Sequence, residues 1–349
     1  MPARSGGEEV SGRGVSSWAI LAALAACGGG TSDTPDAPSI DAPDVCDPSP
    51  RTVAPTAFIG PTGLQPRVTA LIDSATQTLD VQMYLFTVKA LADRIVAARA
   101  RGVAVRVILD PDEVGNDAVR PVFTAGGVPV RNASKIYPFS HAKYLSIDGT
   151  TVAIMSMNFN SDAMTKERNY GFVDTDARDV ADVQHIFEMD WALAGAEAPK
   201  PADLTCTRLV VAPVNAESKL LAHVNGAHTT LEIEALYVTE ISLRNAVGAA
   251  ADRGVVVRVI IEDPSDQAQN AATRTYFEGK GIKVHYALNQ FYLHAKLIVV
   301  DGVAFVGSEN FSTSGLQMNR EVGGLLVEPA AAKVESDQFE LDWTATLGT

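Results

Sequence analysis

The segments HAKYLSIDG at residues 141–149 and HAKLIVVDG at residues 294–302 decide the fold of this chain. Each begins with a histidine and a lysine two positions apart, continues as an apolar run and ends with Asp-Gly. The apolar run predicts a buried strand, and Asp-Gly favours a tight turn into a returning strand. Because the pattern occurs twice, the sequence indicates an internal duplication.

The duplication extends well beyond these two segments. LDVQMYLF at 79–86 corresponds to LEIEALYV at 231–238, and ARARGVAVRVILD at 98–110 corresponds to ADRGVVVRVIIED at 251–263. Within each copy an Ala-rich helical stretch separates two predicted strands, and a glycine ends the helix. The two copies superpose at an offset of 152 to 153 residues. The order strand, helix, strand therefore occurs in both halves.

This order predicts an α/β fold in which helices cover the faces of two similar sheets. The Pro-rich and polar segment EAPKPADLT at 197–205 is the expected linker between them. We therefore expect one domain over 51–197 and a second over 198–349. Trp191 and Trp343, in the closing helices of the two copies, are expected to be core residues.

Side chains two apart in a strand lie on one face, so the histidine and lysine of each copy reach into the same space. If Asp148-Gly149 forms the whole turn, Ser156 lies opposite His141, and Asn158 faces the same side. In the second copy the return strand is one residue shorter, so its serine and asparagine need a different turn or a bulge. One His, Lys, Ser and Asn are thus expected to converge in each copy.

The doubled pattern resembles the paired motif of the phospholipase D superfamily, over nearly all of residues 51–349. The first copy comprises His141, Lys143, Asp148, Ser156 and Asn158, and the second comprises His294, Lys296, Asp301, Ser308 and Asn310. The resemblance implies two phospholipase D-like domains, each a mixed sheet flanked by helices, packed with pseudo-twofold symmetry around one active site. It also implies that one histidine attacks phosphorus and forms a phosphohistidine. The other histidine then protonates the leaving group and activates water or an alcohol.

The residue types suit this chemistry. Two lysines and two asparagines around a phosphodiester supply cationic and neutral donors to the charge of the transition state, so we expect neither a metal nor a cofactor. Imidazole suits both nucleophile and acid because its pKa lies near neutrality. Asp148 and Asp301 fall in the predicted turns, and we interpret them as structural. Met155 stands where the second copy has Gly307, and we expect it to narrow that side of the pocket.

One difference between the copies predicts their roles. The segment after the second motif reads Asn-Arg-Glu and ends at Glu321, whereas the corresponding segment of the first copy reads Glu-Arg-Asn and ends at Asn169. A carboxylate at this place usually orients a histidine in the superfamily. Glu321 beside an imidazole favours its charged form, whereas Asn169 leaves its own histidine more often neutral. We therefore predict His141 as nucleophile and His294 as acid.

The first 27 residues resemble an export signal, because Trp18–Ala26 form a short apolar run behind Arg4 and Arg13. The run ends in Leu-Ala-Ala-Cys at Cys27, which resembles the lipobox of bacterial lipoproteins and implies lipidation of this cysteine. An ordinary secretory signal is the alternative. Residues 28–50 are rich in Pro, Asp and Ser, so we expect a disordered spacer there.

Two further cysteines, Cys46 and Cys206, remain for an oxidising compartment, where pairing is the default expectation. A Cys46–Cys206 disulfide would join the end of the spacer to the junction between the halves, and two free thiols are the alternative. We expect the chain to be exported and either attached through Cys27 to the bacterial cell envelope, at the outer membrane or in the periplasm, or secreted.

Three functions are compatible with the motifs: a phospholipase D acting on phospholipid head groups, a nuclease of the same chemistry, and a binding protein whose motif has decayed. Both motif copies are complete, which opposes the third. The net charge of −14 and the membrane attachment disfavour nucleic acid without excluding it. Tyr137, Phe139, Phe291 and Tyr292 precede the two motifs; packing is their usual role, and a rim for lipid chains is the alternative. We expect a monomer.

Overall fold

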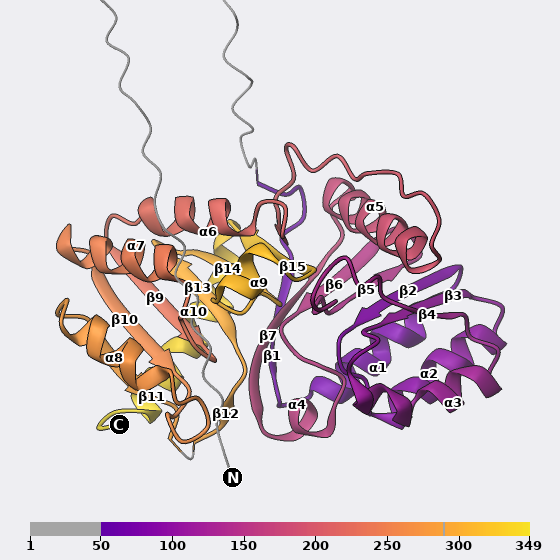
Figure 1. The fold of residues 1–349 in the computed structure, drawn as a ribbon, viewed down its shortest axis with the longest axis horizontal. Helices are drawn as coiled ribbons and strands as arrows, with labels where there is room; N and C mark the ends of the chain where they lie inside the picture. The colour runs from indigo at the N-terminus through magenta and orange to yellow at the C-terminus, as the bar shows by residue number, and fades with distance from the viewer. Residues whose placement is uncertain (1–49, 289) are drawn as a thin grey trace, which may run out of the picture. The chain divides into compact units, whose positions relative to one another are not determined.

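The computed structural model describes residues 50–288 and 290–349, all within one compact unit. Figure 1 shows that they form two sheets flanked by helices, with the first half of the chain on the right and the second on the left. The elements of the first half are β1 (Thr56–Gly60), α1 (Leu64–Ser74), β2 (Thr78–Met83), α2 (Lys89–Ala100), β3 (Ala104–Leu109), the 3₁₀ helix η1 (Val114–Ala118), α3 (Arg120–Ala125), β4 (Val130–Asn132), β5 (Tyr144–Ile147), β6 (Thr151–Met155), α4 (Ser161–Thr165), β7 (Glu167–Asp174) and α5 (Ala177–Ala194).

The second half follows nearly the same order, with α8 in place of η1 and α3 and with the short strand β12 added. Its elements are β8 (Leu209–Ala212), α6 (Ala216–Asn225), β9 (Thr230–Ala235), α7 (Ile241–Asp252), β10 (Val256–Ile261), α8 (Asn270–Glu278), β11 (Lys283–Tyr286), β12 (Tyr292–Leu293), β13 (Lys296–Val300), β14 (Val303–Gly307), α9 (Thr313–Gln317), β15 (Glu321–Leu326) and α10 (Pro329–Ala345). Among the described residues, no helix is long and apolar enough to cross a membrane.

The strand order is the same in both sheets. The first sheet has the order β1-β7-β6-β5-β2-β3-β4, and the second has the order β8-β15-β14-β13-β9-β10-β11. In each sheet three strands are parallel, β2, β3 and β4 in the first and β9, β10 and β11 in the second. The hairpin strands and those beyond them, out to β1 and β8, are antiparallel. The predicted α/β fold with two similar mixed sheets is therefore confirmed. The predicted domain boundaries stay a prediction.

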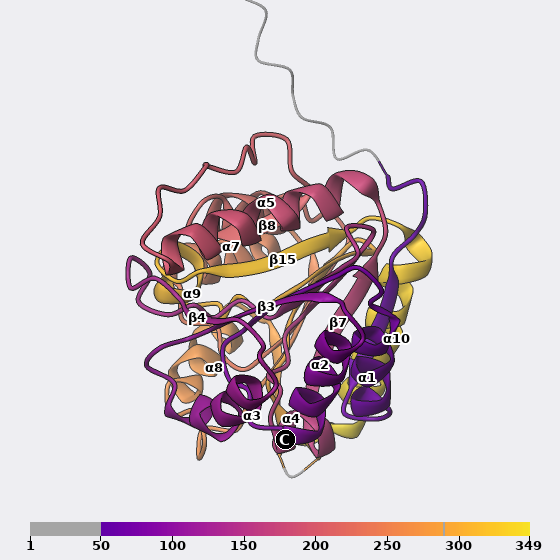
Figure 2. The ribbon, with the colours of Figure 1, turned by 90° about the vertical axis from the view of Figure 1, so that its right-hand side faces the viewer.

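Three apolar cores hold the layers together. In the first half α1, α2 and α3 cover one face of the sheet and α5 covers the other, as Figures 1 and 2 show. The core under α5 is shared, because Phe187 of α5 and Phe339 of α10 belong to one buried cluster together with strand residues of both halves. Trp191 stacks on Phe187 and Trp343 stacks on Phe339, each with ring centroids 5.9 Å apart. Both tryptophans are thus packing residues, as predicted.

The first hairpin differs from the prediction by one residue. Ile147 pairs with Thr151, so three residues, 148–150, form the turn rather than the Asp-Gly dipeptide alone. This shift removes the predicted pairing of Ser156 with His141. The backbone N–H of Ser156 instead donates to a carbonyl of β7.

The second hairpin has the two-residue turn. Val300 pairs with Val303, which leaves only Asp301 and Gly302 between the strands. The extra residue of the first copy is therefore absorbed in its turn, and the second copy needs no bulge. Ser308 reaches a place equivalent to that of Ser156, because its N–H also donates to the neighbouring strand, at Val322.

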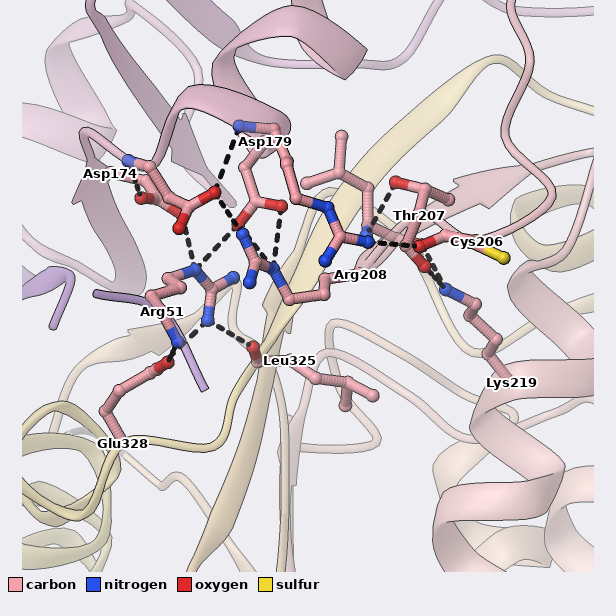
Figure 3. Close-up of polar contacts among 12 residues, drawn as sticks. Arg51, Asp174, Asp179, Cys206, Thr207, Arg208, Lys219, Leu325 and Glu328 are labelled. Carbon is pink, nitrogen blue, oxygen red and sulfur yellow. Dashed lines mark hydrogen bonds and ion pairs between the residues drawn. The ribbon is translucent and has the colours of Figure 1, made fainter. Parts of the chain in front are cut away.

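A buried ionic cluster joins the two halves near the start of the described chain (Figure 3). Arg51 Nε lies 2.6 Å from Asp174 and 2.7 Å from Asp179 in the first half, and its Nη1 lies 3.0 Å from Glu328 in the second. Arg208 shares Asp179 at 2.9 Å. Burial, together with the neighbouring Asp179, raises the pKa of Asp174 to about 6. The single guanidinium of Arg51 therefore holds carboxylates from both halves.

Replacing Arg51 with methionine should lower the free energy of unfolding by about 3–5 kcal/mol, because it leaves buried carboxylates without their partner. Chemical denaturation at pH 7 measures this change. Arg94→Met is the control: its pair with Asp73 is solvent-accessible, so its loss should lower the free energy of unfolding far less. Equal losses in the two variants would contradict the interpretation of the cluster as a joint between the halves.

Several predictions concern residues outside the described ranges. The signal segment 1–27, the lipidation site Cys27, Cys46 and nearly all of the spacer lie there. Cys206 is disulfide-bonded, but its predicted pairing with Cys46 stays a prediction. Export and attachment to the cell envelope likewise stay predictions.

Candidate active site

The two H-x-K segments meet where the halves contact each other. The backbone N–H of His141 donates to the carbonyl of Arg320 at 2.9 Å, and that of His294 donates to the carbonyl of Arg168 at 3.1 Å. The short strand β12, directly before His294, also pairs with β7 of the other half. Each histidine is therefore carried by its own half but tied to the backbone of the opposite half.

Each histidine is oriented by a side chain from the other half. His141 Nδ1 lies 2.8 Å from Glu321 Oε2, and His294 Nδ1 lies 3.1 Å from Asn169 Oδ1. Because a carboxylate only accepts hydrogen bonds, the proton on His141 is placed at Nδ1, which leaves Nε2 with its lone pair. Sequence reasoning assigned Glu321 and Asn169 to the histidines of their own copies. That pairing is wrong, since the contacts cross between the halves.

The serines of both motifs support these orienting side chains. Ser308 Oγ donates to Glu321 Oε2 at 2.7 Å, and Ser156 Oγ donates to Asn169 Oδ1 at 2.8 Å. Each Oγ also accepts the backbone N–H of a residue on the next strand. The predicted supporting serines thus act on the histidine of the opposite half, through the residue between them.

Both motif lysines are fully buried beneath the histidines. Lys143 Nζ donates to the carbonyl of His141 and Lys296 Nζ donates to that of His294, both at 2.6 Å. Burial lowers the pKa of Lys143 to about 7. Burial, and then the charge of Lys143, hold the pKa of Lys296 well below its ordinary value. A bound anion would reverse this effect, because it favours the charged form of both ammonium groups.

The histidines are nearly as enclosed. Their side chains are 10% and 12% exposed for His141 and His294, so only an edge of each ring reaches solvent. Burial lowers the pKa of His141. Burial and then the charges of Lys296 and Lys143 lower the pKa of His294 well below its ordinary value. Without a bound anion both imidazoles are therefore favoured in the neutral form, His294 more strongly, and a phosphodiester anion would favour the charged form of each.

The two motif asparagines have unused acceptors at the site. Asn158 is buried, and Asn310 is partly buried. Within residues 50–288 and 290–349, the Oδ1 atoms of both find no hydrogen-bond partner. An amide whose oxygen is unpaired inside a protein is available for a ligand or for water.

The two motif aspartates lie at the other end of the strands and act on backbone. Asp148 accepts the N–H groups of residues 76–78 at 2.7–3.1 Å, and Asp301 accepts those of residues 228–230 at 2.7–2.9 Å. Burial opposes ionisation of Asp148, but the hydrogen bond from the Thr76 hydroxyl and then these backbone bonds lower its pKa to about 2. This geometry supports the structural interpretation of both aspartates.

Sequence reasoning missed a carboxylate that fixes the residue before each histidine. Asp110 follows β3 and accepts the N–H of Ser140 at 2.8 Å, and Glu262 follows β10 and accepts the N–H of Leu293. An acidic residue at the end of the same buried strand in both copies was the available signal. Burial raises the pKa of Glu262 to about 7.

Two arginines, one from each half, form equivalent ion pairs across the contact between the halves. Arg168 Nε lies 2.7 Å from Asp342 in the closing helix of the second half, and Arg320 Nη2 lies 2.9 Å from Asp190 in that of the first. Phe291 and Tyr137 stack on these guanidinium groups, 5.0 Å and 4.4 Å from ring centroid to Cζ. Both rings therefore pack on a guanidinium group, and Phe291 also lines a cavity, so the alternative of a lipid rim stays a prediction.

Glu309 is a further buried carboxyl group that sequence reasoning missed. Neither of its oxygens has a hydrogen-bond partner among the described residues, and burial raises its pKa well above the ordinary value. A Cβ on Gly307 would lie 2.1 Å from Glu309 Oε2, so the glycine makes room for this carboxyl. The first half has Met155 and Met157 at these places. Met155 belongs to the first core rather than to a pocket wall, which corrects its predicted role.

A cavity of about 610 Å³ lies beside β12. Its walls include Arg168, Glu262, Phe291 and Tyr292, but neither catalytic candidate histidine. Among residues 50–288 and 290–349, no group of three or more His, Cys, Asp or Glu side chains is arranged to hold a metal ion.

Comparison with known proteins identifies the repeats. Residues 68–191 and 220–343 each match the family model described as cardiolipin synthase, PLD-like domain. The chain is 28% identical over 228 residues to a probable cardiolipin synthase of Bacillus subtilis, which covers 58% of this chain and 45% of that protein. It is 26% identical over 312 residues to a cardiolipin synthase of Listeria welshimeri, covering 77% and 64% of the two chains. The chain thus spans between about half and two thirds of these relatives.

Solved structures share the fold at low sequence identity. A phosphatidylserine synthase from Haemophilus influenzae aligns with a TM-score of 0.65 at 12% identity, covering 85% of this chain and 88% of that one. A polyphosphate kinase from Porphyromonas gingivalis aligns with a TM-score of 0.64 at 15% identity, covering 83% and 47%. These likenesses describe the fold alone.

Proposed function

Since this chain belongs to the phospholipase D superfamily, in the family of cardiolipin synthase PLD-like domains, we propose that it cleaves or transfers the head group of a phospholipid through a phosphohistidine. The observation that carries the proposal is the crossed arrangement of the two motif histidines. Each Nδ1 is engaged by a side chain of the opposite half, above a buried lysine from its own motif. We infer that the two Nε2 atoms face one phosphodiester, because the rings are close enough for the charge of His141 to lower the pKa of His294.

In the first step His141 is the nucleophile. Its Nε2 lone pair forms a bond to phosphorus while the bond from phosphorus to the leaving oxygen breaks, and His294 gives its Nε2 proton to that oxygen. Phosphorylation leaves a positive charge on the ring of His141, which the Glu321 carboxylate at 2.8 Å stabilises. Asn169 offers His294 no such charge. The assignment of His141 as nucleophile therefore stays a prediction, and it now rests on this contact instead of the pairing expected from the sequence.

In the second step His294, now neutral, removes a proton from water or an alcohol. The oxygen attacks phosphorus, the nitrogen–phosphorus bond breaks, and its electron pair returns to His141. Water yields hydrolysis, and a second alcohol yields transfer of the phosphatidyl group. Both outcomes use the same residues, so the acceptor decides between a hydrolase and a transferase.

The lysines and asparagines act on the charge of the phosphoryl group. Lys143 and Lys296 place two cationic donors in a region without bulk water, where they stabilise developing charge most strongly. Asn158 and Asn310 add neutral amides at the same place. These four side chains together account for the charge stabilisation that metal ions supply in many other phosphoryl-transfer enzymes.

Exposed apolar residues favour a lipid over nucleic acid. Ile136 and Phe139 lie just before the first H-x-K segment and are 61% and 42% exposed. Met318, three residues before Glu321, is 48% exposed. The backbone N–H of Arg320 donates to the carbonyl of Phe139, which places these residues at the edge of the site. The net charge of −14 also opposes binding of a polyanion.

Purified protein in the presence of a chelator tests the proposal. We expect release of choline or another head group from phospholipid micelles, and formation of a phosphatidyl alcohol when a primary alcohol is added. Plasmid DNA should stay intact under the same conditions. Nicking of DNA without lipid cleavage would replace the proposal with an endonuclease, and loss of all activity on chelation would contradict the mechanism.

A further inference from the structure

The two halves carry a carboxylate and an amide in reversed order around the arginine that pairs across the contact between them. The first half reads Glu167-Arg168-Asn169 and the second reads Asn319-Arg320-Glu321. In both halves the third residue contacts the histidine of the opposite half, and the first residue contacts the third. The histidine therefore meets a carboxylate directly in one case and through an amide in the other.

The contacts around His294 show how far the carboxylate is removed. Asn169 Nδ2 donates to Glu167 Oε2 at 3.1 Å, and the same Glu167 oxygen lies 3.9 Å from His294 Nδ1. Glu167 is 5% exposed and Asn169 is fully buried. Because the Asn169 amide nitrogen faces Glu167, its oxygen must face His294, and the imidazole must carry its proton on Nδ1.

We propose that Glu167 is a positioning residue for His294. Glu167 orients Asn169 by a hydrogen bond, and its negative charge, which lies behind Asn169, favours the protonated imidazole of His294. The inference rests on the proposed function, since it explains how one of two similar histidines becomes the proton donor.

The intermediate distance of the carboxylate suits a group that must both give and recover a proton. A carboxylate in direct contact stabilises the imidazolium strongly and so retards loss of its proton, whereas a site without any carboxylate leaves the ring neutral. His141, which has to carry charge as a phosphohistidine, has the direct contact. His294, which has to cycle between charged and neutral, has the indirect one.

Of the other groups that face His294, three oppose its protonation and one favours it. Burial lowers the pKa of His294 most, followed by the charges of Lys296 at the start of β13, Lys143 before β5 and His141, while a backbone hydrogen bond at Ser156 raises it. Glu167 adds a negative charge on the Nδ1 side of the His294 ring, at 3.9 Å. Burial raises the pKa of Glu167 itself, while the hydrogen bond from Asn169 and the charge of Lys296 lower it. An imidazolium at 3.9 Å favours the ionised carboxylate in turn.

Two substitutions of Glu167 separate its charge from its hydrogen bond. Glu167→Gln keeps an oxygen that accepts from Asn169 but removes the charge, and Glu167→Met removes both. Glu335→Gln is the matched control, because Glu335 is a fully buried carboxyl of α10 that the mechanism does not use. Thermal unfolding of all three variants identifies any loss of fold.

The first readout is the pH profile of kcat with the lipid substrate. Loss of the negative charge lowers the pKa of His294, so the fall in rate toward alkaline pH should begin about 0.5–1 unit earlier in Glu167→Gln. We expect kcat to fall roughly 10-fold above neutrality with KM nearly unchanged, and a further loss in Glu167→Met. Glu335→Gln should keep the wild-type profile. A change confined to KM, or an unchanged profile, would overturn the proposal.

The second readout does not need turnover. An NMR titration of labelled histidine, with the His294 signal assigned from the His294→Asn variant, measures the pKa of the ring directly. It should be lower in Glu167→Gln than in the wild type. If the pKa of His294 is lower in Glu167→Gln but the wild type cleaves no phosphodiester, the proposed function fails and the inference about Glu167 stands. If the two titrations coincide, the inference itself is wrong.

Discussion

Replacing His141 with asparagine should lower the rate of phosphodiester cleavage by roughly 10⁴- to 10⁶-fold, because it removes the nucleophile of the proposed reaction. Asparagine still donates a hydrogen bond from a similar position, so the buried Glu321 keeps a partner. The loss should therefore appear in kcat rather than in the stability of the protein. Steady-state kinetics with a phospholipid substrate and thermal unfolding of the same preparation measure the two quantities.

His294→Asn distinguishes the two steps of the reaction. With a nitrophenyl phosphodiester, the leaving group needs no proton, so this variant should release one equivalent of nitrophenol and accumulate a phosphorylated His141 peptide. The His141→Asn variant should show no burst. His185→Asn, at an exposed histidine outside the site, is the control and should retain full activity. A burst in His141→Asn and none in His294→Asn would exchange the two roles.

The sequence predicts where the site lies better than it predicts which side chains contact each other there. H-x-K before an apolar run, found twice, was sufficient to predict two similar α/β halves. The structure places His141, Lys143 and His294 just before β5 and β13 instead of within the predicted strands. Nothing in the periodicity of one half specifies which residue of the other half it contacts. The orienting pairs of His141 with Glu321 and of His294 with Asn169 are therefore visible only when the halves are assembled.

The local sequence also does not show where the first hairpin accommodates its one additional residue. Asp148-Gly149 has the composition of a two-residue turn, yet both residues take positive φ, 53° and 64°, inside a three-residue loop. The turn absorbs Thr150 because it lies at the solvent-exposed end of the hairpin, whereas a bulge near the histidines would disturb the site. A one-residue shift near the histidines would turn the side chains of the strand to the opposite face of the sheet.

Replacing Lys143 with methionine should lower kcat/KM by about 10³-fold, because it removes a buried cationic donor from the phosphoryl group. The same change should leave the protein equally or more stable at pH 7. The pKa of Lys143 is lowered from 10.5 to about 7 in the fold. Between these values the unfolded chain binds a proton that the folded chain releases, so stability rises with pH across this window. Methionine removes the cost of burying that charge, which outweighs the one hydrogen bond that Lys143 donates to the His141 carbonyl. Activity and stability should therefore move in opposite directions.

Lys219→Met provides the matched comparison. Burial also lowers the pKa of Lys219, to about 8, but its Nζ donates to the carbonyls of Thr207 and Leu209, away from the histidines. This variant should lose stability, since two carbonyls lose their donor, and should keep its kcat/KM. If Lys143→Met retained activity within a few-fold, the buried lysine would be a packing residue. The charge on the phosphoryl group would then have to be stabilised by Lys296 and the two asparagines alone.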